Sequence, residues 1–296
     1  MIDTLVISIW CFMFGACTGS FLGLCAYRLP MGRYEPVRAG IPTTDTPLSI
    51  SRPTRSFCPV CKHQLHFLHI IPILSWIALR GRCAYCKTRV PVRYTVIEIL
   101  SGMFATLSYL RFGLTPTALA IFIVVSALIL ITFIDLDYMI IPNVINYPGT
   151  ALGLLLGLLS SFTPLNWIIP LERPFVQSWL ESLLGIIFGA GPLYLVWWLY
   201  LVIRKREGLG LGDIKLLIAI GALFGYECAL LTIFLGSVLG SVAGVLLILV
   251  KRMGFSTAIP FGPYLVAGTL VYLYNFADVI SFLSGASTST IWRAFQ

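Results

Sequence analysis

Charged side chains are scarce in this sequence. Only 11% of its 296 residues are Asp, Glu, Lys or Arg, against roughly 25% in an ordinary soluble domain. This scarcity excludes a soluble globular protein, and a hydrophobic content of 58% excludes a disordered chain. The glycines follow no collagen period, and 8 cysteines are too few for a disulfide scaffold. The class that remains is a protein that crosses the membrane several times.

The sequence also lacks the glycine patterns that bind phosphates. Its glycine-rich stretch, 208–215, contains neither the GxxxxGK[ST] loop nor the GxGxxG pattern. Asp135-Leu136-Asp137 matches the short Asp-x-Asp motif of metal–nucleotide sites, but no soluble α/β domain accompanies it. A nucleotide-binding enzyme is therefore not predicted.

Apolar stretches of nearly membrane-spanning length recur along the chain. A crossing needs about 20 residues. The fold class predicted is an all-α polytopic membrane protein with about eight transmembrane helices. The boundary near Gly225 is the weakest, so 214–250 is alternatively one span and a re-entrant segment. The predicted spans are 4–26, 95–112, 117–134, 144–162, 179–203, 214–227, 229–250 and 261–283.

Positive charge is concentrated on one side of this topology. Eleven of the 20 basic residues lie in 28–93, opposed by only Glu35 and Asp45. With the basic residues at 204–206, 215 and 251–252, seventeen of 20 fall on the same side. The positive-inside rule places that side in the cytoplasm and the amino terminus outside it. Orientation and anionic membrane lipid account for the net charge of +8, so no nucleic acid is expected.

The topology divides the chain into three predicted parts. Residues 1–27 form the first transmembrane helix, 28–93 a cytoplasmic basic domain, and 94–296 the remaining transmembrane bundle.

Two cysteine pairs predict a metal site in the basic domain. Cys58 and Cys61 form one CxxC pair, Cys83 and Cys86 form another, and 21 residues separate them. This is close to the zinc-ribbon spacing, in which four thiolates hold a structural Zn²⁺. Two disulfides or redox pairs are the alternative, but thiols in the cytoplasm stay reduced.

Three histidines lie between the two cysteine pairs, at positions 63, 66 and 69. Because four thiolates already complete a tetrahedral site, we expect the histidines to form a polar face. A closed site of this kind folds the loop and performs no chemistry.

Acidic residues at the ends of predicted spans are the candidates for chemistry, because ionisable groups there are costly and functional by default. Asp135 directly follows one apolar run, and Asp213 directly precedes another, both at the cytoplasmic membrane level. Two carboxylates brought together in a partly dry site share a proton, so that one acts as base on water and the other as acid. The alternatives are a snorkelling end residue for Asp135 and a helix N-cap for Asp213. The remaining candidates are Glu98, Asp137, Glu181 and Glu227.

Alternate glycines precede Asp213. Gly208, Gly210 and Gly212 remove side chains from the loop and allow positive φ. Such a loop suits the close approach of an extended peptide, although a hinge uses glycines in the same way.

Together these residues resemble the type IV prepilin peptidases, also called prepilin leader peptidase/N-methyltransferases, which are similar to other GxGD intramembrane aspartic proteases. The resemblance extends over nearly the whole chain. It rests on Gly19-Ser20-Phe21-Leu22, Tyr27-Arg28-Leu29-Pro30, the cysteine loop, the segment from Asp135 to Asn143, and Gly210-x-Gly212-Asp213-x-Lys215.

The resemblance implies an activity and its site. Asp135 and Asp213 match the family's catalytic aspartates, and Gly210, Gly212 and Lys215 belong to the supporting loop. The implied substrates are type IV prepilins or pseudopilins, cut after the glycine that ends a short basic leader, at the cytoplasmic face of the bacterial inner membrane. The resemblance also implies N-methylation of the new amino terminus with S-adenosylmethionine, associated with the cysteine loop, and assigns no cofactor-binding residue.

The chain departs from the family pattern at three places. Gly23 stands where asparagine is usual, Tyr94-Thr95 replaces Tyr-Pro, and Pro142-Asn143 replaces the commoner Pro-Asp. None of these changes affects the aspartate pair.

Two other function classes remain open at this point. An ion-coupled transporter would also use membrane carboxylates, but nearer the midplane and within repeated, broken helices. A membrane-tethered zinc-ribbon adapter would bind a partner through its basic loop and would leave both aspartates dispensable.

Overall fold

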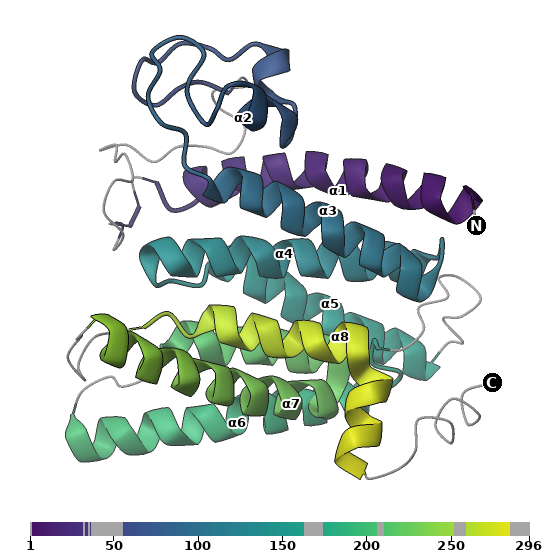
Figure 1. The fold of residues 1–296 in the computed structure, drawn as a ribbon. Helices are drawn as coiled ribbons and strands as arrows, with labels where there is room; N and C mark the ends of the chain where they lie inside the picture. Colours follow the sequence, from purple (N-terminus) through teal and green to yellow (C-terminus); the bar gives the residue numbers. More distant parts are fainter. Residues whose placement is uncertain are drawn as a thin grey trace. The chain divides into compact units, whose positions relative to one another are not determined.

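The computed structural model describes residues 2–31, 33–34, 36, 56–162, 174–205, 210–251 and 259–284. Within these ranges the chain is helical and contains no strand, only two isolated bridges. Contacts divide the chain into two compact units, 1–139 and 140–296. The long helices are α1 (Ile2–Arg28), α3 (Arg93–Phe112), α4 (Pro116–Tyr138), α5 (Asn143–Phe162), α6 (Trp179–Arg204), α7 (Leu211–Lys251) and α8 (Gly262–Ser284), shown in Figure 1.

Five of these helices, α1, α4, α5, α6 and α7, are long and apolar enough to cross a membrane. The predicted all-α polytopic membrane fold is confirmed. Helix α7 has 41 residues and is interrupted at Gly225, where φ is 80° and ψ is −177°. Figure 1 shows the chain turning back there, so α7 is two successive helices and the helical segments match the predicted spans in order. The part before Gly225 is only about 21 Å long at about 1.5 Å per residue, short of a hydrocarbon core of about 30 Å.

In the first unit, α1 packs antiparallel on α3 along a line of glycines. Gly15, Gly19 and Gly23 are four residues apart, so they lie on one face of α1. A Cβ atom at Gly19 would lie 2.6 Å from the Cα of Glu98, and one at Gly15 would lie 2.6 Å from the Cβ of Ala105. Small residues let the two backbones approach, which is how helices associate in lipid.

Both ends of α4 are fixed by local signals. Thr115 is the N-cap and accepts a hydrogen bond from the amide of Ala118 at 3.2 Å, and Pro116 occupies the first helical turn. At the other end Met139 adopts the left-handed conformation, with φ 53° and ψ 39°, and donates its amide to the carbonyl of Asp135 at 2.8 Å. The last turn of α4, which carries Asp135, therefore has a defined backbone.

In the second unit, small residues bring α6 and α7 together. Gly185 and Gly221 face each other without room for a Cβ on either, and a Cβ at Gly189 would lie 2.8 Å from that of Ala229. Glu181 caps the start of α6 by accepting a hydrogen bond from the amide of Gln177 at 2.9 Å. This accounts for Glu181 as a structural group at a helix start.

Between α1 and α3 lie the 3₁₀ helix η1 (Phe67–Ile70), the short helix α2 (Leu74–Ala78) and the four patterned cysteines. We call residues 56–92 the cysteine domain.

Candidate functional site

The four cysteines of the cysteine domain converge. The Sγ atoms of Cys58, Cys61, Cys83 and Cys86 all lie within 4.8 Å of one another, and those of Cys58 and Cys86 are 3.8 Å apart. A tetrahedron with metal–sulfur bonds of about 2.3 Å has edges of about 3.8 Å, so the cluster has the dimensions of a four-thiolate metal site. All eight cysteines are free in this structure, so the four thiols of the cluster are not joined as disulfides there. The cluster is a site that can bind a metal ion.

The two halves of the cluster have the same local structure, offset by 25 residues. In each half the backbone carbonyl of the first cysteine accepts a hydrogen bond from the backbone amide of the lysine four residues later. The distance is 2.8 Å for Lys62 and 3.1 Å for Lys87. Both lysines have positive φ, 57° and 61°. Isolated bridges close the two halves at matching places, Phe57–Gln64 and Arg82–Arg89. Each CxxC pair is thus a knuckle whose turn directs two thiols to one point.

The environments of the thiols differ across the cluster. Burial raises the pKa of Cys58 to about 11. The Sγ atom of Cys86 lies 3.3 Å from the Oγ1 atom of Thr88. This side-chain hydrogen bond lowers the pKa of Cys86 to about 6. Cys86 therefore supplies a thiolate at neutral pH, and binding of a cation would draw the proton from Cys58.

The histidines between the pairs are not part of the cluster. His63 and His69 instead pack on the ring of Tyr85, with ring centroids 3.7 and 5.6 Å apart. They complete an aromatic group beside the second knuckle.

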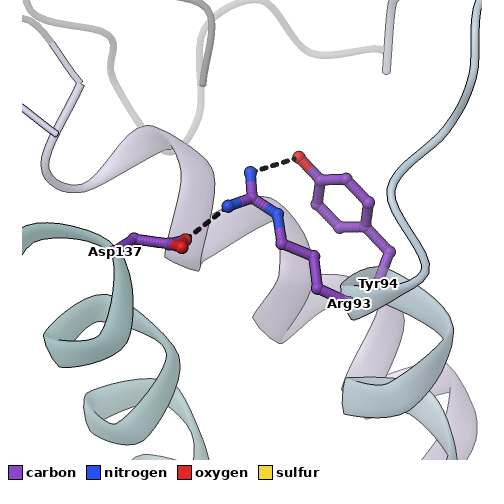
Figure 2. Close-up of polar contacts among 3 residues, drawn as sticks. All are labelled: Arg93, Tyr94 and Asp137. Carbon is purple, nitrogen blue, oxygen red and sulfur yellow. Dashed lines mark hydrogen bonds and ion pairs between the residues drawn. The ribbon is translucent and has the colours of Figure 1, made fainter. Parts of the chain in front are cut away.

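The two acidic residues at the end of α4, Asp135 and Asp137, are each only 4% exposed. Figure 2 shows Asp137 paired with the guanidinium of Arg93, the first residue of α3. Arg93 also donates to the hydroxyl of Tyr94 at 3.2 Å. Asp137 is therefore an ion-paired group that joins the ends of α3 and α4. The sequence reasoning missed this pair, because no local pattern links residues 44 positions apart.

Glu98 links the cysteine domain to the helices of its unit. Its Oε2 atom accepts a hydrogen bond of 2.7 Å from the amide of Ile73, which stands directly before α2 and has a φ of 63°. Glu98 is 8% exposed. An acidic residue inside a predicted span thus has a structural partner.

Asp213 is the third residue of α7 and is 8% exposed. It is not the N-cap, because the helix begins at Leu211 and the amide of Asp213 already donates to the carbonyl of Gly210 at 3.1 Å. Its carboxylate reaches back over Gly210, where a Cβ atom would lie 3.0 Å from Oδ2.

Gly210 and Gly212 leave space for neighbouring side chains, those of Asp213 and Ile141. Gly212 lies inside α7 with helical backbone, so positive φ is not its role, contrary to the expectation. A Cβ there would lie 3.1 Å from the Cβ of Ile141. Gly208 lies outside the described residues.

Lys215 links the start of α7 to the start of α5 by a side-chain hydrogen bond. Its ammonium donates to the Oδ1 atom of Asn143 at 3.1 Å and lies 5.6 Å from the ring centroid of Tyr147. Gly212 and Lys215 thus pack against 141–147, the segment that follows Asp135 in the sequence. Asp135 belongs to the first unit and Asp213 to the second.

Two family models match the chain. Residues 13–112 match the bacterial peptidase A24 N-terminal domain, and residues 122–245 match the type IV leader peptidase family. The first match ends with α3, and the second includes the end of α4 and the start of α7.

Relatives similar over most of their length carry one name, prepilin leader peptidase/N-methyltransferase. The protein from Pseudomonas putida is 33% identical over 268 residues, which are 88% of each chain. That from Aeromonas salmonicida (strain A449) is 33% identical over 277 residues, 89% of each. That from Burkholderia pseudomallei (strain 1026b) is 34% identical over 270 residues, 88% of this chain and 82% of the relative. No solved structure has significant similarity to the chain. Buried aspartates at two helix ends, a four-cysteine cluster and these relatives agree: the chain belongs to the prepilin leader peptidase/N-methyltransferase family.

Proposed function

We propose that this protein removes the leader peptide from type IV prepilins or pseudopilins and then N-methylates the new amino terminus. The observation that carries the proposal is the similarity, over 88% of both chains, to a relative with that name. The fold supports it, because a prepilin leader is cut where an apolar helix leaves the membrane, and helices α4 and α7 place acidic residues at their ends.

We propose Asp135 and Asp213 as the catalytic residues. Both are less than one-tenth exposed, and burial favours a shared proton between two carboxyl groups. One carboxylate takes a proton from water as the water oxygen attacks the carbonyl carbon of the leader's last glycine. The other carboxyl donates its proton to the amide nitrogen, the C–N bond breaks, and a free amino terminus is released. Asp137 is the weaker candidate, because its charge is held by Arg93.

The loop residues support this chemistry by position. Gly210 leaves space under the carboxylate of Asp213, and Gly212 and Lys215 hold the start of α7 against 141–147. A Cβ at Gly210 would crowd the carboxylate of Asp213, and one at Gly212 would crowd Ile141.

For the second activity, S-adenosylmethionine would supply the methyl group. The new amine is the nucleophile and loses a proton on transfer. We assign no residue to the binding of this cofactor.

We further propose that the cysteine cluster holds Zn²⁺ in a structural role. Four thiolates leave no open coordination position, which is typical of structural zinc. We also propose that the 28–93 domain lies in the cytoplasm against anionic lipid, because it carries eleven of the 20 basic residues.

The test uses the full chain in membranes with a model prepilin, and scores leader loss by gel shift and methylation by mass spectrometry. Asp135→Asn and Asp213→Asn should each lower the cleavage rate at least about a hundredfold, whereas Glu227→Gln, a half-buried acidic control, should retain it. Cys58→Ser should lower the zinc content. Normal cleavage by either aspartate variant would remove that residue from the catalytic pair. Failure of the intact protein on several prepilins would favour the adapter or the transporter, which a flux assay separates.

A further inference from the structure

The cysteine domain contains a pocket that no proposed activity uses. It has a volume of about 430 Å³, and its lining includes Trp76, Gly81 and three arginines, Arg80, Arg82 and Arg89. The indole nitrogen of Trp76 donates to the carbonyl of Val90 at 3.2 Å, so one wall of the pocket is fixed. The residues that line the pocket include three arginines and no acidic residue, so its charge favours an anionic ligand. The same charge disfavours the sulfonium of S-adenosylmethionine.

Large apolar side chains are exposed on α2, which contributes Trp76 to the pocket, and on η1, which contacts α2. On α2, Leu74 is 66% and Ile77 is 60% exposed, and on η1, Phe67 is 64% and Leu68 is 52% exposed. Helix α2 also carries Trp76, and Arg80 lies two residues beyond its end. An apolar surface bordered by arginines and a tryptophan is the composition of a segment that lies in a membrane interface.

The hydrogen bond from Ile73 to Glu98 sets the depth of α2. Glu98 lies five residues inside α3, about 8 Å from its start at about 1.5 Å per residue. It packs opposite Gly19, nine residues before the end of α1. The start of α2 therefore lies beside α1 and α3, about 8 Å from the start of α3.

We propose that η1 and α2 form an interfacial membrane-binding surface, whose apolar side chains enter the acyl boundary while the arginine pocket binds the phosphate of an anionic phospholipid. Charge complementarity selects this occupant: every charged residue in the pocket lining is an arginine, and the exposed surface of α2 is apolar. The proposal does not depend on the peptidase activity.

The test places a photo-crosslinking residue on this surface and on a matched control. The full chain carries p-benzoylphenylalanine at Ile77 or at Val60, which is 59% exposed but lies on the first cysteine knuckle. Each variant is placed in nanodiscs of phosphatidylcholine with 30 mol% phosphatidylglycerol, and adducts are identified by mass spectrometry. Zinc content shows that the cysteine domain is folded, and Leu74 is the second insertion position if the Ile77 variant does not fold.

We expect lipid adducts at position 77 and not at 60, with phosphatidylglycerol enriched over its share of the bilayer. Arg80→Gln with Arg82→Gln should lower the enrichment about fivefold per arginine. Lys62→Gln with Lys87→Gln removes the same charge from the two knuckles and should leave the enrichment unchanged. Equal adducts at both positions, no lipid adduct at 77, or phosphatidylglycerol at its bulk share would overturn the proposal. An adduct at 77 with added prepilin in place of lipid would assign the surface to the substrate instead.

Discussion

The pair formed by Arg93 and Asp137 should contribute strongly to the stability of the first unit. The two side chains are only 14% and 6% exposed, so little solvent screens them. Removing one member of a buried pair leaves the other uncompensated, at a cost of about 3–5 kcal/mol. Arg93→Met, which keeps the length of the side chain, should therefore lower the midpoint of thermal unfolding by the order of 10 °C.

A double-mutant cycle separates this effect from lost packing. The protein in detergent is heated in steps, and the folded fraction is measured by size-exclusion chromatography for Arg93→Met, Asp137→Leu and the double variant. Replacement of both members by apolar residues should recover most of the loss, because no buried charge is left alone. An unchanged midpoint for Arg93→Met, or a double variant whose loss is the sum of the two single losses, would refute the reasoning.

Three further predictions concern packing and protonation. Gly212→Ala should reduce leader cleavage by crowding Ile141, and the additional change Ile141→Ala should restore part of the rate; no rescue would mean that the glycine acts otherwise. Gly19→Ala should lower the unfolding midpoint by overpacking α1 against α3, at a cost of about 1–3 kcal/mol, whereas Gly191→Ala, with nothing within 4 Å of the new Cβ, should not. Bound metal, measured by mass spectrometry after dialysis at each pH, should be retained at pH 7.5 and released in acid below the metal-free pKa of Cys86, about 6, because protons then compete with the metal for the thiolates; full retention in strong acid would contradict four-thiolate binding.

The features that could be predicted from the sequence are those encoded by local pattern. Apolar length predicted the helices, and the spacing of two CxxC pairs predicted the cluster, because each knuckle is made within a few residues of its own cysteines. Gly225 shows where such reasoning weakens. The hydropathy of 214–250 is nearly continuous, and the break is made by one backbone conformation that composition does not record.

The polar contacts between helices could not be predicted, because they depend on register. Glu98 and Asp137 were noticed only as costly acidic residues in or near spans. Their partners, the amide of Ile73 and the guanidinium of Arg93, were decided by how α1, α3 and α4 pack. For Gly212 the expected lack of a side chain agrees with the structure and the expected positive φ does not; the neighbour that it makes room for, Ile141, lies about 70 positions away and could not be predicted.

The glycine line on α1 has a consequence for the order of events during synthesis. The partner of this face is α3, and the entire cysteine domain is translated between the two helices. Until α3 has been synthesised, the glycine face of α1 has no helix packed on it. The entropy of closing a loop rises with its length, so a cysteine domain that folds early around a metal ion shortens the effective distance between α1 and α3. If the cluster holds Zn²⁺ as proposed, cells starved of zinc should accumulate newly made chains whose first helix is inserted but not packed on α3.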